Sequence, residues 1–232
     1  MTFSSWHAHG NVYLLAERAD LTPDRVRDAA AGTDGIVEVL SAGHDEAEVV
    51  IWNPDGSTAE LSGNGTRIAA AWLADRTGAA GVRIRVRGGR EVTARLLDGG
   101  LIETDMGDVE IGDPEQVEGI ELRTVSVGNP HAVVRGDPDE IRRIGPLLET
   151  HPRFPNRTNV QVVRVDGPGE VSGRIWERGV GETTASGTSA VAVAAATHEE
   201  GDVLVHFPGG DLRVRLAGGR AWLTGPAERL DP

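Results

Sequence analysis

The sequence predicts an α+β fold of two pseudo-symmetric lobes, each a sheet or barrel of strands wrapped around a central helix. The first observation is a repeat: residues 48–71 and 172–195 share an Ile-Trp pair and a Ser-Gly pair at a constant offset of 124 residues. The second is that the following segments, 88–105 and 209–225, resemble each other. The third is that a Gly-Asn pair precedes each repeat, as Gly10-Asn11 and Gly128-Asn129. Matched features in the same order indicate an internal duplication.

Each repeat reads as a strand, a turn, a glycine-rich step, a helix and a β-hairpin. The short runs before each step are rich in β-branched residues and are typical of strands. The alanine-rich runs after each step contain neither Pro nor Gly, as a buried helix requires. Asp98-Gly99-Gly100 and Gly218-Gly219 are hairpin-turn sequences. The expected elements are strands 47–52 and 171–176, helices 68–74 and 190–197, and hairpin strands 82–87, 91–97, 101–104, 212–216 and 221–224.

The segment 107–121 is acidic and rich in Gly and Pro, which places the crossover between the lobes there. We therefore expect an N-terminal lobe of residues 1–112, completed by the C-terminal strand 220–232, and a C-terminal lobe of residues 113–219.

Composition excludes several classes of function. The chain of 232 residues has no cysteine and a net charge of −13, so disulfides and thiolate metal sites are absent, and a nucleic-acid or anionic-membrane partner is disfavoured. No apolar run reaches the roughly 20 residues of a membrane span, and no secretory signal is visible at the start, so we expect a cytoplasmic protein.

Among the histidines, only His7 and His9 are spaced as metal ligands can be, so no metal site is expected. Gly63-x-Gly65 lacks the rest of a nucleotide-binding fingerprint.

The two Ser-Gly steps are the candidate site. Ser62-Gly63 and Ser186-Gly187 each stand where a strand and turn feed a helix, and the first amides of a helix carry partial positive charge. Such a step suits a carboxylate. Two steps facing one another would stabilise the enediolate formed when a proton α to a carboxylate is removed. Serine is also a good N-cap, and capping and ligand binding are compatible.

Six stretches in order along nearly the whole chain resemble motifs of the diaminopimelate epimerase family, in the proline racemase/diaminopimelate epimerase-like superfamily. The stretch NPDGSTAELSGNGTRIAAAWL resembles its first active-site motif, and WERGVGETTASGTSA resembles its second. The remaining four are HGNVYL (9–14), GTDG (32–35), VGNPHAVV (127–134) and FPNRTNVQVV (154–163).

The resemblance implies a cofactor-independent amino-acid isomerase that converts LL- to meso-diaminopimelate in lysine or cell-wall precursor synthesis, with its active site in the cleft between the lobes. It implies no cofactor and a small amino-acid substrate, and it leaves a homodimer open. By position, it implies that Ser62 and Ser186 stand where the family carries its two catalytic cysteines, with His131 and Glu177 near them. The groups it implies for substrate binding are Asn11, Asn53, Asn159, Glu177 and Arg178, with the backbone amides of Gly63, Asn64, Gly187 and Thr188. Taken singly, Asn11 could serve a turn, and Glu177 and Arg178 could form a surface ion pair.

The serines depart from the family pattern, as do Val12 for the usual Asp and Ser189 for the usual Gly. A thiol near pH 8.5 can deprotonate a carbon acid, whereas a serine hydroxyl needs a neighbour to take its proton. Three explanations stay open: serines activated by His131 or Glu177, a relative with changed chemistry, or replacement in the laboratory. The alternatives to an epimerase are a dehydratase or isomerase of another small amino or hydroxy acid, and a catalytically silent amino-acid-binding protein.

Overall fold

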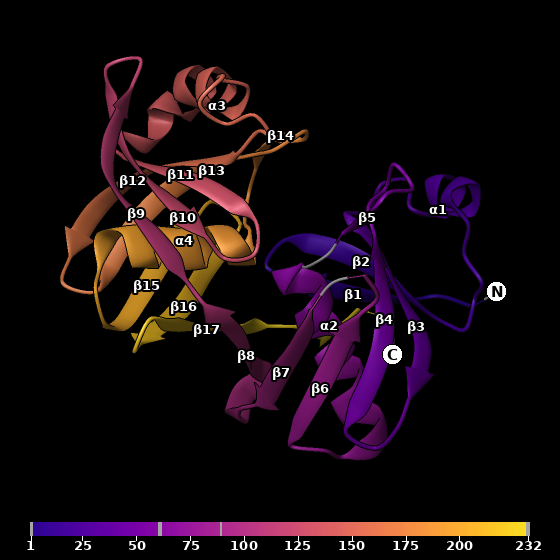
Figure 1. Cartoon of the computed structure of the whole chain (residues 1–232). Helices are drawn as coiled ribbons and strands as arrows, with labels where there is room; N and C mark the ends of the chain where they lie inside the picture. The colour runs from indigo at the N-terminus through magenta and orange to yellow at the C-terminus, as the bar shows by residue number, and fades with distance from the viewer. Residues whose placement is uncertain (1, 60–61, 89, 231–232) are drawn as a thin grey trace. The chain divides into compact units, whose positions relative to one another are not determined.

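The computed structural model describes residues 2–59, 62–88 and 90–230, and the chain divides into two compact units (Figure 1). Unit 1 comprises Met1–Asp105 and Thr224–Pro232, and unit 2 comprises Met106–Leu223. Positions 60 and 61 of the first glycine-rich motif, position 89, and positions 231–232 of the expected C-terminal strand lie outside the described residues.

Unit 1 surrounds one long helix with strands. Its elements are β1 (Ser4–Ala8), β2 (Asn11–Glu17), α1 (Pro23–Ala29), β3 (Gly35–Ala42), β4 (Glu46–Trp52), β5 (Thr58–Ala59), α2 (Gly63–Thr77), β6 (Gly81–Val86), β7 (Glu91–Leu96), the start of β8 (Leu101–Asp108) and β18 (Glu228–Arg229).

Unit 2 repeats this plan. Its elements are β9 (Glu110–Val117), β10 (Ile120–Ser126), β11 (Pro130–Arg135), α3 (Ile141–Glu149), β12 (Asn159–Gly167), β13 (Glu170–Glu177), β14 (Gly181–Thr183), α4 (Gly187–Thr197), β15 (Gly201–Phe207), β16 (Gly210–Ala217) and the start of β17 (Arg220–Pro226).

The strand pairings confirm the duplication. In unit 1, β2 runs parallel to β3, β3 antiparallel to β4, and β4 parallel to β6. In unit 2, β11 runs parallel to β12, β12 antiparallel to β13, and β13 parallel to β15. The registers of these antiparallel pairs agree as well. Ile36 is paired with Trp52 in unit 1, and Val160 is paired with Trp176 in unit 2. Both residues of the second pair follow their counterparts in the first by 124 positions. A small helix, α1 or α3, occupies the crossover between the first parallel pair of each unit.

The central helices are buried and rich in alanine. Residues 63–74 of α2 and 187–196 of α4 are all buried. Helix α2 packs against β3, β4, β6 and β7, and α4, drawn in orange in Figure 1, packs against strands that include β10, β15 and β16. Alanine in these helices lets the surrounding strands approach closely, and both helices are therefore buried on all sides rather than on one face.

The expected elements are all present, with some differences in length. The central helices begin earlier than predicted, directly after Ser62 and Ser186, because the glycines that weaken a helix interior lie here in the first turn. Strand β8 extends beyond the predicted 101–104, to Asp108. The segment 107–121, where the composition places the crossover, contains strand β9, which pairs with β10. Pro114 of β9 is paired with Arg123, next to a shift in register between Arg123 and Val125. Such an irregularity is where a strand accommodates a proline.

Within the described residues, no helix is long and apolar enough to cross a membrane.

Candidate functional site

Ser62 is the N-cap of α2. Its backbone is extended (φ −134°, ψ 119°), and its Oγ accepts a hydrogen bond from the Gly65 amide at 3.1 Å. The amides of Gly63 and Asn64 belong to the first turn, where a helix offers no intrahelical acceptor. The Gly65 position is also tight, because an added Cβ would lie 3.0 Å from a methyl carbon of Ile51. This end of α2 therefore presents two polarised amides beside a serine hydroxyl.

Ser186 occupies the same place at α4 with the same extended backbone (φ −150°, ψ 130°). Its side chain makes no capping hydrogen bond, in contrast to Ser62. The side chain is half-buried, and Gly187 and Thr188 behind it are buried. The hydroxyl of Ser186 is thus not committed to stabilising its helix.

His131, on β11, supports the first turn of α4 through two amide side chains. Its Nδ1 accepts from Gln161 Nε2 at 3.1 Å, so its Nε2–H donates to Asn129 Oδ1 at 2.9 Å. Asn129 then donates to Thr188 Oγ1 at 3.3 Å, and Gln161 donates to Ser189 Oγ at 3.0 Å. Burial lowers the pKa of His131 from 6.5 to about 3, and the charge of Arg178 acts in the same direction. The ring is therefore neutral at physiological pH.

A buried arginine lies in the first turns of α2. Arg67 has no exposed surface and donates to Asn64 Oδ1 at 2.5 Å. Within the part of the chain that the structure describes, its Nε and Nη1 atoms have no hydrogen-bond partner. Burial lowers the pKa of Arg67 to about 10, and Tyr13 acts in the opposite direction. Tyr13 also lies with its Oη 3.4 Å from Ser62 Oγ, which brings a phenol to the candidate catalytic hydroxyl.

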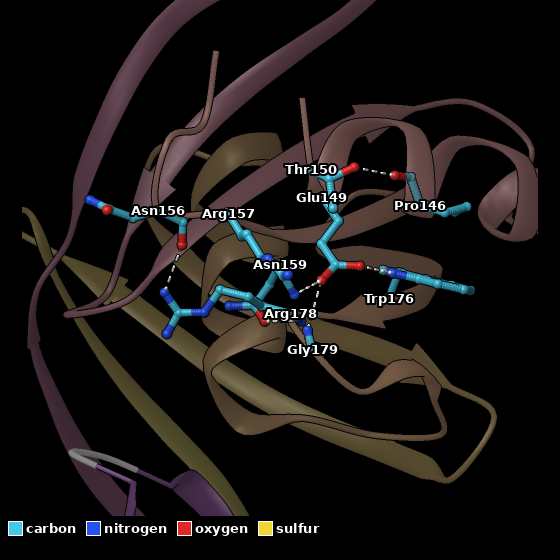
Figure 2. Close-up of polar contacts among 9 residues, drawn as sticks. All are labelled: Pro146, Glu149, Thr150, Asn156, Arg157, Asn159, Trp176, Arg178 and Gly179. Carbon is cyan, nitrogen blue, oxygen red and sulfur yellow. Dashed lines mark hydrogen bonds and ion pairs between the residues drawn. The ribbon is translucent and has the colours of Figure 1, made fainter. Parts of the chain in front are cut away.

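Glu177 ends β13, and Arg178 begins the turn that follows it. Two buried side chains, Glu149 and Asn159, hold this turn (Figure 2). Glu149, at the end of α3, accepts from the Gly179 amide at 2.8 Å and from Trp176 Nε1 at 2.7 Å. Asn159 accepts from the Arg178 amide at 3.0 Å while its own Nδ2 donates to the Pro130 carbonyl at 3.0 Å.

This arrangement leaves the two charged side chains of the turn outside the core. Arg178 is exposed and its guanidinium donates to the Asn156 carbonyl at 3.2 Å. Glu177 is half-buried and accepts from Thr183 Oγ1 at 3.1 Å. A cation and a carboxylate on one fixed turn can bind the carboxylate and the ammonium of an amino acid.

The remaining asparagines of the predicted set lie in turns of unit 1. Asn53 donates to Ser57 Oγ at 2.9 Å. It lies in a tight turn in which the Gly56 amide donates a hydrogen bond to the Asn53 carbonyl. Asn11 donates to the His9 carbonyl at 3.1 Å and opens β2.

In unit 2 the structure brings Asn159 and Arg178 together, and it links His131 to Thr188. In unit 1 it brings Ser62, Gly63 and Asn64 together at the start of α2, whereas Asn53 bonds within its own turn and Asn11 bonds to the His9 carbonyl.

Sequence reasoning missed four residues that shape these sites: Tyr13, Arg67, Glu149 and Gln161. Two had a visible signal, since Arg67 stands beside an alanine-rich run and Gln161 interrupts the apolar run Val160–Val163. A charged or amide side chain in a buried element needs a partner, and this need indicates a polar site. Tyr13 and Glu149 carried no such signal.

A family model described as diaminopimelate epimerase matches residues 14–112 and 123–230. The diaminopimelate epimerase of Pelotomaculum thermopropionicum is 35% identical, with 99% of this chain and 97% of that protein covered. The diaminopimelate epimerase of Methanothermobacter thermautotrophicus is also 35% identical, with 91% and 89% covered.

Solved structures share the fold at low identity. A predicted epimerase from Pseudomonas aeruginosa superposes with a TM-score of 0.78 at 17% identity, covering 99% of this chain and 96% of the other. A hydroxyproline epimerase from Agrobacterium vitis superposes with a TM-score of 0.69 at 16% identity, covering 99% and 90%. With the match of the family model over both repeats, the sequence identities show that this chain belongs to the diaminopimelate epimerase family.

Proposed function

We propose that this chain is a cofactor-independent epimerase that inverts an α-carbon of diaminopimelate, converting the LL to the meso isomer. The observation that carries the proposal is the paired Ser-Gly step, in a member of this family: each unit starts its buried central helix directly after an extended serine. The proposal places the enzyme in the cytoplasm, in the synthesis of lysine or a cell-wall precursor.

Ser62 and Ser186 are the proton-transferring residues of this proposal, at the positions where the family resemblance places cysteines. One hydroxyl accepts the α-proton, and the other supplies a proton to the opposite face of the carbon. The amides of Gly63, Asn64, Gly187 and Thr188 bind the reacting carboxylate. Removal of the α-proton converts that carboxylate into an enediolate, whose added negative charge the helix N-termini stabilise.

The rest of the proposed set recognises the amino-acid groups of the substrate. Glu177 binds an ammonium and Arg178 binds a carboxylate, supported by their fixed positions on one turn. Asn159 orients that turn, and Asn11 and Asn53 complete the substrate set.

His131 acts in this proposal as a neutral partner of the first turn of α4, near Ser186. This role is supported by the Asn129 and Gln161 contacts of its two ring nitrogens and by its low pKa, which makes it a weak base. Glu177, half-buried at the end of β13, is then the ionisable carboxylate of the proposed site.

The experiment is incubation of the protein with LL-diaminopimelate in D₂O, followed by chiral separation and mass analysis. An epimerase produces the meso isomer with deuterium at the inverted carbon. If neither inversion nor α-deuterium uptake is detected between pH 6 and 10 and across low to molar salt, the proposal is wrong. Calorimetric binding without exchange would instead identify an amino-acid-binding protein, and loss of water from other small amino or hydroxy acids would identify a dehydratase.

The double variant Ser62→Cys, Ser186→Cys tests the remainder of the site. A thiolate is the better base near neutral pH, so this variant gains epimerase activity if the substrate-binding groups are intact. Sedimentation of the unmodified chain decides whether it is a monomer or a homodimer.

A further inference from the structure

Tyr13 and His131 occupy equivalent positions of the two units. The sequences Gly10-Asn11-Val12-Tyr13 and Gly128-Asn129-Pro130-His131 share a Gly-Asn pair with a titratable ring two residues after the asparagine. The sheet registers confirm this equivalence, because Tyr13 pairs with the first residue of β3 and His131 pairs with the first residue of β12. The duplication has therefore placed an ionisable ring behind the N-terminus of each central helix.

The two rings make different contacts. Both nitrogens of His131 are engaged by Asn129 and Gln161. The phenol of Tyr13 instead lies at Ser62 itself, with 3.4 Å between the two oxygens. This separation is longer than an optimal O–H···O bond, and such contacts in ligand-free enzymes often shorten when the substrate binds.

The hydrogen bond that Ser62 accepts leaves its own hydroxyl hydrogen able to point toward the phenol. Ser62 Oγ already accepts from the Gly65 amide at 3.1 Å. A hydroxyl carries one hydrogen and can donate it while accepting from another group. With Gly65 as its donor, Ser62 can direct that hydrogen toward the Oη of Tyr13.

The ring of Tyr13 is held in place by close packing. Tyr13 belongs to the buried core cluster of unit 1 and is 8% exposed. Gly35, opposite it on β3, makes room for the ring, since an added Cβ there would lie 2.8 Å from Tyr13 Cε1. The phenolic oxygen is thus fixed by packing and does not depend on the Ser62 contact for its position.

Arg67 supplies charge compensation. Its side chain is buried, and a negative charge on Tyr13 favours its protonated form. Coulombic interactions weaken with distance, so the Arg67 cation lies close enough to act on a charge that develops at the Tyr13–Ser62 pair. When a proton leaves or enters the Tyr13–Ser62 pair, the change in charge is therefore partly offset by Arg67, within unit 1.

We propose that Tyr13 is a positioning residue that acts through Ser62, taking the hydroxyl proton of Ser62 as that serine removes the α-proton of the substrate. In this step the Cα–H bond breaks and a new Oγ–H bond forms, while the original Oγ–H bond breaks and an Oη–H bond forms. The negative charge passes from the phenolate to the enediolate. In the reverse direction the neutral phenol returns its proton through Ser62 to the carbon, so atoms and charge balance both ways.

The relay answers the difficulty that serine poses, because a hydroxyl becomes a base only when a neighbour takes its proton. It rests on the proposed function, since the proton transferred is that of the epimerised carbon.

The test is a double-mutant cycle of Tyr13→Phe with Ser62→Cys, assayed for kcat and KM in both directions and for α-deuterium exchange. Tyr13→Phe removes one oxygen and keeps the packed ring. In the Ser62 background we expect kcat to fall by about 10²-fold or more with KM unchanged, the usual size of a lost acid–base group. In the Ser62→Cys background the same change should have little effect, because a thiol ionises without a relay.

Thr104→Val is the matched control. Thr104 is buried in unit 1, and its Oγ1 has no hydrogen-bond partner within the described residues. This substitution removes a buried hydroxyl that bonds to no described residue, and it should leave kcat and KM unchanged. Thermal unfolding of each variant checks that it is folded.

Equal losses from Tyr13→Phe in both backgrounds would overturn the relay and assign Tyr13 a structural role. So would an undiminished kcat in the Ser62 background. Absence of any exchange by the unmodified protein would instead refute the proposed function, so the two failures are distinguishable.

Discussion

Glu149→Gln tests how the turn carrying Glu177 and Arg178 is held. Glu149 is 7% exposed and accepts two short hydrogen bonds, from Trp176 Nε1 and from the Gly179 amide (Figure 2). Glutamine keeps one carbonyl oxygen, so its NH₂ group must face one of the two donors. A stranded buried donor costs about 1–3 kcal/mol, and the remaining bond loses about 1 kcal/mol when its acceptor is no longer charged. We expect the free energy of unfolding to fall by about 3 kcal/mol.

Denaturant unfolding measures the global loss, and hydrogen exchange at the Gly179 amide measures the local one. The control is Glu140→Gln, where an exposed pair with Arg143 is neutralised, at a cost of less than about 1 kcal/mol. We also expect KM to rise more than kcat falls, because the turn no longer fixes the proposed substrate-binding groups. If the two variants lose the same stability and Gly179 keeps its protection, the buried carboxylate does not hold the turn.

The pH dependence of stability provides a second measurement on the same variant. Burial raises the pKa of Glu149, but the hydrogen bonds from Trp176 and Gly179, together with Arg157, outweigh it and lower the pKa below 4.5. A depressed carboxyl pKa stabilises the folded state above the unfolded value and loses that contribution as the pH falls through the folded value. Glu149→Gln should therefore be less sensitive to acid than the unmodified protein below about pH 4.5.

Three further variants test individual contacts. Ser62→Ala removes an N-cap bond and should lower the unfolding free energy by about 1 kcal/mol, whereas Ser186→Ala, without such a bond, should leave it nearly unchanged; equal losses would contradict the difference between the two steps. Burial keeps His131 neutral with a pKa of about 3, so stability should fall as the pH decreases from 6.5 toward 3, and His131→Gln should flatten that slope in acid-unfolding curves. Gly145→Ala would place a Cβ 2.6 Å from Trp176 Cβ, and overpacking should cost about 1–3 kcal/mol in thermal unfolding; an unchanged midpoint would show that α3 can move away.

The sequence located the fold and the two central helices well because a duplication repeats its information. The Ile-Trp and Ser-Gly pairs recur at one offset, and the same offset governs the register of β3 with β4 and of β12 with β13. Local chemistry also placed the hairpin turns, where Gly218 and Gly219 both adopt positive φ. The strand β9 was harder to predict, since its Gly and Pro content is typical of a connection and its pairing with β10 is a non-local interaction.

What the duplication could not determine is how each repeat satisfies its polar groups. Trp52 and Trp176 are equivalent in sequence, yet Trp52 donates its indole N–H to Glu38 on β3, and Trp176 donates to Glu149 on α3. Likewise Tyr13 lies at Ser62, whereas its counterpart His131 is held by two amides. By itself the sequence determined the repeated backbone, because hydrophobic pattern and turn residues act locally. Only the tertiary structure decided which buried donor meets which acceptor, because those partners come from elements distant in the chain and must be brought together by packing.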